Sequence, residues 1–128
     1  MKLPFTINLN DKVAVVTGGG GVLCAEFAAA LAANGAKVAV LDLNGEAAEK
    51  VAAKLREEGA TAIGVSANVL ERKSLEAAAE RVSKELGPCD LLLNGAGGNH
   101  PKGTTTKDWF ELSDLSDPSL TTFFDLDP

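Results

Sequence analysis

The feature that most constrains the fold is an apolar run that breaks into four glycines and then continues as a helix. Val13 to Thr17 is short, apolar and rich in β-branched residues, as in strands that are buried on both faces. Gly18 to Gly21 follow, and the segment "VLCAEFAAALAANG" then has helical spacing and ends at Gly35. We expect its buried face to carry Leu23, Phe27, Ala30, Leu31 and Asn34. A strand, a glycine turn and a helix in this order predict a turn that can approach a phosphate group closely.

The same alternation of strand and helix continues along the chain. Further strands are predicted at Lys37–Leu43, Thr61–Ser66 and Cys89–Leu93. Two helical segments lie between them, residues 44–59 with Asn44 as the cap and residues 71–88 with a glycine-proline stop. Their expected buried faces are Ala48, Val51, Ala52 and Leu55 in the first helix, and Leu75, Ala78, Ala79, Val82 and Leu86 in the second.

Strands and helices at this spacing imply right-handed crossovers between parallel strands. We therefore predict an α/β fold, a doubly wound parallel sheet of Rossmann type, of which the chain holds the first four βα units. The expected strand order, 3-2-1-4, leaves the strand at residues 89–93 as an exposed apolar edge. After Asn94 the sequence has no sustained period. We expect residues 1–128 to form one dinucleotide-binding domain that is incomplete at its carboxyl end, with a βα core at 1–98 and a loop segment at 99–128.

Composition excludes several classes of function. The formal net charge of −6 opposes binding to nucleic acid, since that affinity comes mainly from Lys and Arg displacing counterions. The opening "MKLPFTINLND" has no continuous apolar core, so it predicts neither a secretion signal nor a membrane anchor. Cys24 and Cys89 are too few for a disulfide scaffold and lack the spacing of metal ligands. We expect a cytoplasmic protein that binds no nucleic acid, membrane or metal ion.

The glycine turn and Asp42 together indicate a dinucleotide. Backbone N–H groups of a glycine turn, and the positive end of the following helix, suit a pyrophosphate, although an ordinary tight turn has the same appearance. Asp42 stands 24 positions after Gly18, where a carboxylate accepts hydrogen bonds from the adenosine ribose. The other interpretation of Asp42 is a solvated strand end or a helix cap. Because no Arg or Lys lies in Leu43 to Gly45 to neutralise a 2′-phosphate, we predict NAD rather than NADP.

At this point the sequence resembles the short-chain dehydrogenase/reductase family over nearly all of its length. The resemblance rests on "TGGGGVLC" at Thr17–Cys24, "VLDLN" at Val40–Asn44, "NV" at Asn68–Val69 and "NGAGG" at Asn94–Gly98. The family's first motif is usually T-G-x-x-x-G-x-G, so Val22 and Cys24 stand where its later glycines would be, and Gly21 takes the role of the first of these. The family's N-N-A-G becomes "NGAG", so Gly95 departs from the pattern.

The resemblance implies hydride transfer between a nicotinamide and a carbonyl or alcohol, and a set of cofactor-binding positions. In this sequence they are Gly18, Gly20, Gly21, Val22, Leu23, Asp42, Leu43, Asn68, Val69, Asn94, Ala96 and Gly97. Asn68 replaces an aspartate that many members hold beside the adenine, and an amide still offers a donor and an acceptor to the base edge. "TGGGGVLC" followed by "NGAGGNHPKGTT" is most similar to sugar-acid oxidoreductases of the D-mannonate or fructuronate type, which implies a small polar substrate such as a sugar acid.

The family's chemistry uses a tyrosine as acid and base, a lysine that lowers its pKa and a serine that orients the substrate. The sequence contains no tyrosine, so we assign no catalytic residue in it and expect these residues to be inactive alone. "DLDP" at Asp125–Pro128 has the form of a helix start, which leads us to expect a partial chain whose relatives form homo-oligomers through later helices. Two other classes stay open: a non-catalytic NAD-binding or interaction module, and a methyltransferase-like domain.

Four side chains carry secondary interpretations. Cys24 lies in the first turn of a helix, where a thiolate is stabilised, but buried unreactive cysteine is common, and we interpret it as a small residue in place of glycine. Cys89 is expected in the core. His100 and Lys102 follow "NGAGG" and either contact an acidic substrate or lie in a solvated loop.

Overall fold

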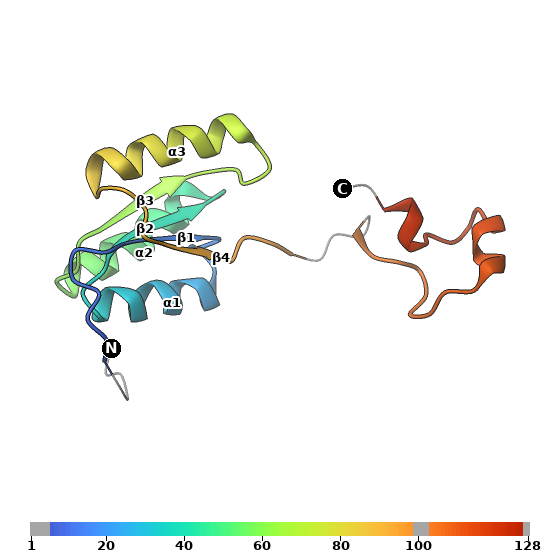
Figure 1. Ribbon diagram of the computed structural model, residues 1–128, viewed down its shortest axis with the longest axis horizontal. Helices are drawn as coiled ribbons and strands as arrows, with labels where there is room; N and C mark the ends of the chain where they lie inside the picture. The colour runs from blue at the N-terminus through green and yellow to red at the C-terminus, as the bar shows by residue number, and fades with distance from the viewer. Residues whose placement is uncertain (1–5, 99–102, 127–128) are drawn as a thin grey trace. The chain divides into compact units, whose positions relative to one another are not determined.

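The computed structural model of the protein describes residues 6–98 and 103–126. The elements run in the order β1 (Val13–Thr17), α1 (Val22–Ala33), β2 (Lys37–Asp42), α2 (Gly45–Glu57), β3 (Ala62–Ser66), α3 (Arg72–Glu85) and β4 (Leu91–Asn94). The strands form one parallel sheet in the order β3-β2-β1-β4, as the sequence predicts (Figure 1). His100, Lys102, Asp127 and Pro128, for which the sequence suggests roles, lie outside the described residues.

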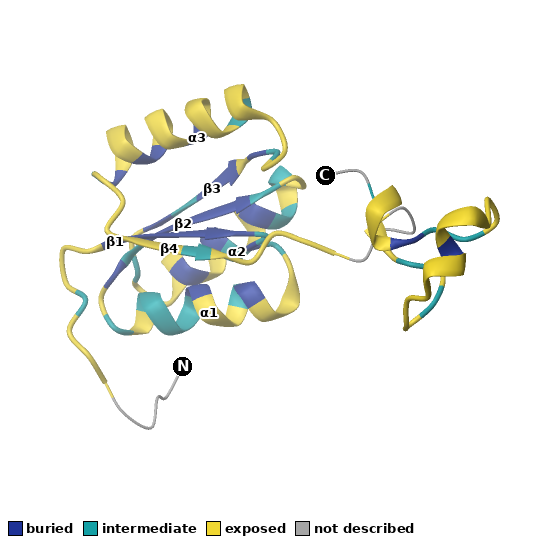
Figure 2. Cartoon of the chain, turned by 45° about the vertical axis from the view of Figure 1, so that its right-hand side comes forward, coloured by how far each residue is buried: buried dark blue, intermediate teal, exposed yellow. Residues whose placement is uncertain are grey.

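Helices cover both faces of this sheet, so the predicted doubly wound α/β fold is confirmed. α1 and α2 lie on one face and α3 lies on the other (Figure 1). β1 is buried along its whole length, and its residues alternate between two hydrophobic clusters. Ala14 and Val16 pack with α1 and α2, whereas Val13 and Val15 pack with α3. Figure 2 shows buried residues in the strands β1, β2 and β3 and on the sides of the helices that face the sheet.

The ends of the helices follow the local signals in the sequence. The side chain of Asn44 accepts a hydrogen bond from Ala47 N at 3.1 Å, so the predicted cap of α2 is confirmed. Gly35 and Gly59 follow α1 and α2 with φ of 94° and 93°, a conformation that other residues adopt only at a cost. Glycine therefore ends both helices where the sequence indicates.

The expected buried face of α1 is wrong at Leu23 and Phe27, whereas Leu31 is half-buried and packs against the core as expected. Leu23 is 73% exposed and Phe27 is 48% exposed, whereas Cys24 and Ala28 face the sheet. The helix is apolar on nearly every side, so its hydrophobic pattern does not indicate which side is buried. Close approach to the sheet favours the small side chains of Cys24 and Ala28 over the larger ones.

The other two helices match their expected faces in part. Ala48, Ala52 and Leu55 of α2 are buried and Val51 is half-buried. On the side of α3, Ala78, Val82 and Leu86 are buried. Leu75 and Ala79 are exposed, because they border a hollow beside the sheet that is described below.

β4 forms an apolar edge of the sheet, as expected from the strand order. Leu91 and Leu92 are 37% and 60% exposed, although they lie in a strand of purely apolar and amide residues. The strand begins at Leu91, two residues later than predicted. Cys89 consequently lies before it and is exposed, so its expected place in the core is wrong.

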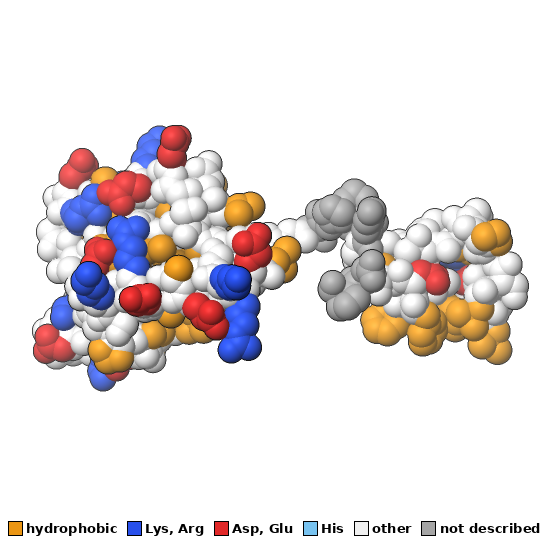
Figure 3. Space-filling model, turned by 90° about the horizontal axis from the view of Figure 1, so that it is seen from above, with side chains coloured by type: hydrophobic (Ala, Val, Ile, Leu, Met, Phe, Trp, Pro, Cys, Tyr) orange, Lys and Arg blue, Asp and Glu red, His pale blue; other side chains and the backbone are white. Residues whose placement is uncertain are grey.

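The chain forms two compact units, Met1–Ala96 and Gly97–Pro128. The described part of the second unit contains the short 3-10 helices η2 (Leu112–Ser116) and η3 (Phe123–Asp125), which are connected by irregular chain. Lys107 Nζ lies 2.8 Å from Asp114 Oδ1 and 3.2 Å from Glu111 Oε2, and these two hydrogen bonds to carboxylates raise the pKa of Lys107. Figure 3 shows hydrophobic side chains gathered along one side of this unit. Its exposed hydrophobic residues include Trp109, Leu112, Phe123 and Phe124. No helix among the described residues is long and apolar enough to span a membrane.

Asp90 connects the start of β1 to the start of β4 and makes folding sensitive to acid. Its carboxylate accepts hydrogen bonds from Val13 N at 2.9 Å and Lys12 Nζ at 3.0 Å, and these contacts, the backbone one first, lower the pKa of Asp90. A lowered pKa in the folded state adds stability above the ordinary pKa and loses that stability as the pH falls.

We expect Asp90→Asn to be less stable than the wild type at pH 7, with the difference shrinking below about pH 4. Urea unfolding from pH 7 to pH 3 measures this difference. Glu80→Gln, at an exposed position of α3, is the control. A difference between wild type and Asp90→Asn that stayed constant with pH would contradict the assignment.

Candidate cofactor-binding site

The carboxyl ends of the strands bring most of the predicted site residues to one edge of the sheet. Thr17 of β1 is in register with Leu41 of β2 and with Asn94 of β4. Asp42 of β2 is in register with Ser66 of β3, two residues before Asn68. β1 has β2 on one side and β4 on the other, and such a point, where successive crossovers leave in opposite directions, is where doubly wound sheets bind their ligands.

The glycine turn at this edge is closely fitted to its neighbours. Gly18 has a φ of 65°, and a Cβ built on it would lie 2.8 Å from Gly95 O and 2.9 Å from Ala96 N. A side chain at Gly20 would lie 2.8 Å from the Cβ of Ala47. Both positions therefore require glycine, the first for conformation and space and the second for space.

α1 begins at this turn without a side-chain cap. Gly21 is its N-cap residue, and the first turn contains no acidic side chain. Val22 and Leu23 follow with exposed fractions of 84% and 73%. The first N–H groups of a helix have no partner within it, so this exposed end presents donors and partial positive charge to an anion.

Asp42 is held at the glycine turn by the backbone. Its Oδ2 accepts a hydrogen bond from Gly20 N at 3.0 Å and its Oδ1 accepts one from Asn44 N at 2.9 Å. Each carboxylate oxygen can accept a second bond, so the group remains able to bind two hydroxyls. Leu43, the next residue, is 73% exposed. A fixed carboxylate that retains free lone pairs suits a ribose diol and repels a phosphate at the same place.

Asn68 and Val69 follow β3 at the same edge. The side-chain amide of Asn68 donates to Glu71 Oε1 at 2.9 Å and accepts from Leu70 N at 3.1 Å. This turn leads directly into α3. The amide of Asn68 therefore has a structural use of its own, which the sequence does not indicate, whereas Val69 is 39% exposed.

The segment after β4 is bonded to the end of β1 by Thr17. The buried Oγ1 of Thr17 accepts hydrogen bonds from Gly95 N at 3.1 Å and Ala96 N at 3.2 Å. Asn94 and Ala96, on either side of Gly95, are exposed, and so is Gly97, which begins the second unit. The sequence does not indicate this role of Thr17 except by its place between an apolar strand and the glycines.

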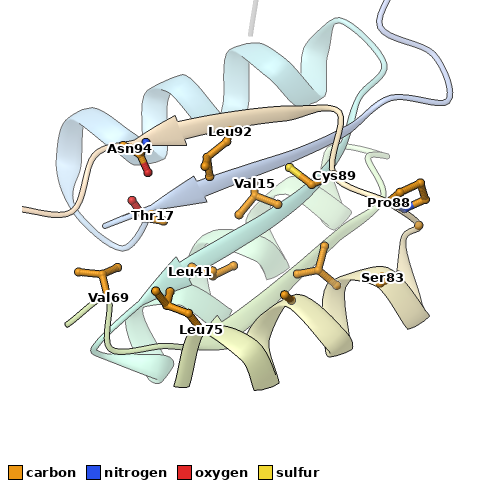
Figure 4. A pocket seen from close by; sticks show the side chains of 13 residues that line it. Val15, Thr17, Leu41, Val69, Leu75, Ser83, Pro88, Cys89, Leu92 and Asn94 are labelled. Atoms are coloured by element: carbon orange, nitrogen blue, oxygen red, sulfur yellow. The ribbon is translucent and has the colours of Figure 1, made fainter. Parts of the chain in front are cut away.

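A hollow of about 580 Å³ lies beside the sheet on the α3 side. Figure 4 shows Thr17 and Asn94 at the ends of β1 and β4, with Val69 and Leu75 across the hollow from them. Its walls are mainly apolar, and neither Asp42 nor the glycines of the turn line it. The hollow therefore reaches this edge of the sheet through Thr17, Asn94 and Val69.

These features fit a dinucleotide. Two parts of a dinucleotide find matching groups: the pyrophosphate at an uncapped helix behind glycines that tolerate no Cβ, and the ribose at an anchored carboxylate. Within the described residues, no three His, Cys, Asp or Glu side chains are placed to hold a metal ion. Fold and site together define a nucleotide-binding protein of the doubly wound class.

Comparison with known proteins identifies the family. The sequence profile of short chain dehydrogenases matches residues 12–124, which is most of the chain. The protein belongs to the short-chain dehydrogenase family. The resemblance that the motifs indicate is thereby confirmed.

Individual relatives agree with this assignment. An uncharacterized oxidoreductase of Haemophilus influenzae is 42% identical over 127 residues, 99% of this chain and 44% of the relative. The uncharacterized oxidoreductase UxuB of Bacillus subtilis is 43% identical over 125 residues, 98% of this chain and 44% of the relative. A crystal structure from Haemophilus influenzae, described as a D-mannonate oxidoreductase with bound NAD, aligns with a TM-score of 0.74 at 44% identity and covers 94% of this chain and 42% of that one. The chain thus spans less than half the length of these relatives.

Proposed function

We propose that this chain is the NAD(H)-binding part of an oxidoreductase that transfers a hydride to or from a hydroxyl or carbonyl of a small polar substrate such as a sugar acid. The observation that carries the proposal is the carboxylate of Asp42, anchored to the glycine turn through Gly20 N. A relative with 44% identity was solved with NAD bound, which supports the same cofactor here. Its description as a D-mannonate oxidoreductase supports a sugar acid as the substrate class.

Each part of the cofactor has assigned residues in this proposal. Gly18, Gly20, Gly21, Val22 and Leu23 bind the pyrophosphate through backbone N–H groups and the amino end of α1. Asp42 and Leu43 bind the adenosine ribose, and Asn68 and Val69 flank the adenine. Asn94, Ala96 and Gly97 contact the cofactor from the β4 side. When bound, the nicotinamide accepts or gives the hydride.

The residues present indicate which part of the proposed activity this chain supplies. The sequence holds no tyrosine, so we assign these 128 residues to cofactor binding and assign no catalytic residue in them. We propose one dinucleotide-binding domain, with its core at 1–98 and a loop segment at 99–128, that assembles into homo-oligomers through regions beyond residue 128. Both cysteines are free thiols, which supports a reducing, cytoplasmic location.

Titration with NADH, NAD, NADPH and S-adenosylmethionine tests the proposal. We expect saturable binding of NADH by calorimetry, with NADPH at least about tenfold weaker because its 2′-phosphate would meet the carboxylate of Asp42. Binding of S-adenosylmethionine without NADH would indicate the methyltransferase-like alternative instead. Binding of neither NADH nor NAD would exclude the proposed function and favour an interaction module.

A further inference from the structure

Two departures from the family pattern, Cys24 and Gly95, contact each other in the fold. Cys24 stands where the family's motif has glycine, and Gly95 stands where the family has a larger residue. A Cβ built on Gly95 would overlap the Sγ of Cys24. The two positions are 71 residues apart in the sequence, so neither motif alone indicates the contact.

Gly95 is glycine for reasons of space. The described glycines with positive φ are Gly18, Gly35, Gly59 and Gly87, so the backbone of Gly95 lies in a region that other residues adopt freely. Besides the thiol, a Cβ on Gly95 would lie 2.9 Å from Thr17 O and 3.4 Å from Leu93 Cδ2. The thiol is therefore the nearest obstacle to a side chain at this position, and the backbone oxygen of Thr17 is a second one that remains when the thiol is removed.

The contact lies directly behind the proposed cofactor-binding backbone. Cys24 is 9% exposed and belongs to the first turn of α1. Gly95 N donates to Thr17 Oγ1, and Gly95 O lies 2.8 Å from where a Cβ on Gly18 would be. Thr17 thus holds Gly95 by a hydrogen bond, and Gly18 and Cys24 lie against it. Asn94 and Ala96, which belong to the proposed cofactor-binding residues, are its neighbours in the chain.

We propose that Cys24 is a positioning residue for cofactor binding, whose Sγ sets the place of the Gly95–Ala96 backbone against the glycine turn. Cys24 and Gly95 then compensate for each other. The side chain of Cys24 on α1 fills the space that a side chain after β4 occupies elsewhere in the family. The inference rests on the proposed NAD(H) binding. It predicts that changes at the two positions are coupled, as expected for residues in contact.

A double-mutant cycle of Cys24→Ala, Gly95→Ala and the double variant tests the coupling, with the dissociation constant of NADH as the measured quantity. We expect Gly95→Ala to weaken NADH binding by about twentyfold and Cys24→Ala by about threefold. The double variant is expected to bind at least about threefold more tightly than Gly95→Ala alone, because the thiol no longer blocks the added methyl group. Cys89→Ala controls for loss of a thiol. Gly98→Ala controls for an added methyl, since a Cβ there meets no atom within 4 Å.

Hydrogen exchange provides a readout that a general loss of stability would not imitate. In Cys24→Ala the amide protons of Gly95 and Ala96 are expected to exchange faster, while those of β2 and β3 keep their rates. This measurement decides the question even if Gly95→Ala fails to fold. Amide exchange that became equally faster throughout the sheet would overturn the positioning role. So would a double variant whose loss of NADH affinity is simply the product of the two single losses. If the wild type bound no NADH, the proposed function would fail, whereas wild-type binding with uncoupled variants would reject only the role of Cys24.

Discussion

Replacing Asp42 with alanine is expected to weaken NADH binding by about thirtyfold. A carboxylate that accepts hydrogen bonds from a ribose contributes about 2 kcal/mol, which corresponds to this factor. Asp42 is held by Gly20 N and Asn44 N, so it is already in place before a ligand arrives. NADPH binding should weaken much less, because the same change removes the charge that repels its 2′-phosphate. Calorimetric titration of both nucleotides measures the change in preference.

The control for this prediction is Asp90→Ala. Asp90 is also a carboxylate that accepts a backbone hydrogen bond, but it lies at the opposite end of the strands. We expect it to lower stability without changing the affinity for NADH. Urea unfolding of both variants separates lost folding from lost binding. An unchanged NADH affinity in folded Asp42→Ala would show that the ribose is bound elsewhere.

The largest effect on stability is expected from Gly64→Ala in β3. A Cβ at Gly64 would lie 2.5 Å from both the Cα and the N of Glu49 and 2.8 Å from the carbonyl carbon of Ala48. These are backbone atoms of α2, so the whole helix must move away from the sheet. Such overpacking costs about 3 kcal/mol or more in a buried site. Urea unfolding measures the loss.

Gly98→Ala is the matched control for Gly64→Ala, because it adds the same methyl group in open space. Its effect on the free energy of unfolding should be within about 0.5 kcal/mol. A Gly64→Ala protein as stable as the wild type would mean that α2 does not rest on the backbone of β3. The expected damage should also disturb the site, since α2 follows Asp42 after only two residues.

Local signals explain what could be predicted from the sequence. β1 begins and ends where its apolar run does, Asn44 caps α2 through its own side chain, and glycines end α1 and α2. The family resemblance indicates Asp42 and Asn94 as site residues, and the parallel register of the strands places them at the same edge of the sheet. Each of these features depends on a few adjacent residues or on the strand order.

What escaped prediction depends on contacts between distant segments. The buried side of α1 is set by how closely Cys24 and Ala28 allow it to approach the sheet, and an alanine-rich helix shows no preferred side in its sequence. The bonds from Thr17 to the segment after β4 join residues 78 and 79 positions apart. The placement of Cys89 outside β4 depends on where pairing with β1 begins.

The alternating burial of β1 has a mechanical consequence. Val13 and Val15 belong to one cluster and Ala14 and Val16 to the other, so the strand cannot shift toward one layer without leaving its place in the second. Each layer therefore restrains the other through a shared element. Gly18 directly follows this strand, so the position of the strand fixes where the glycine turn begins. A ligand that binds such a turn loses little free energy to ordering the protein, since the folding of the sheet has already ordered it.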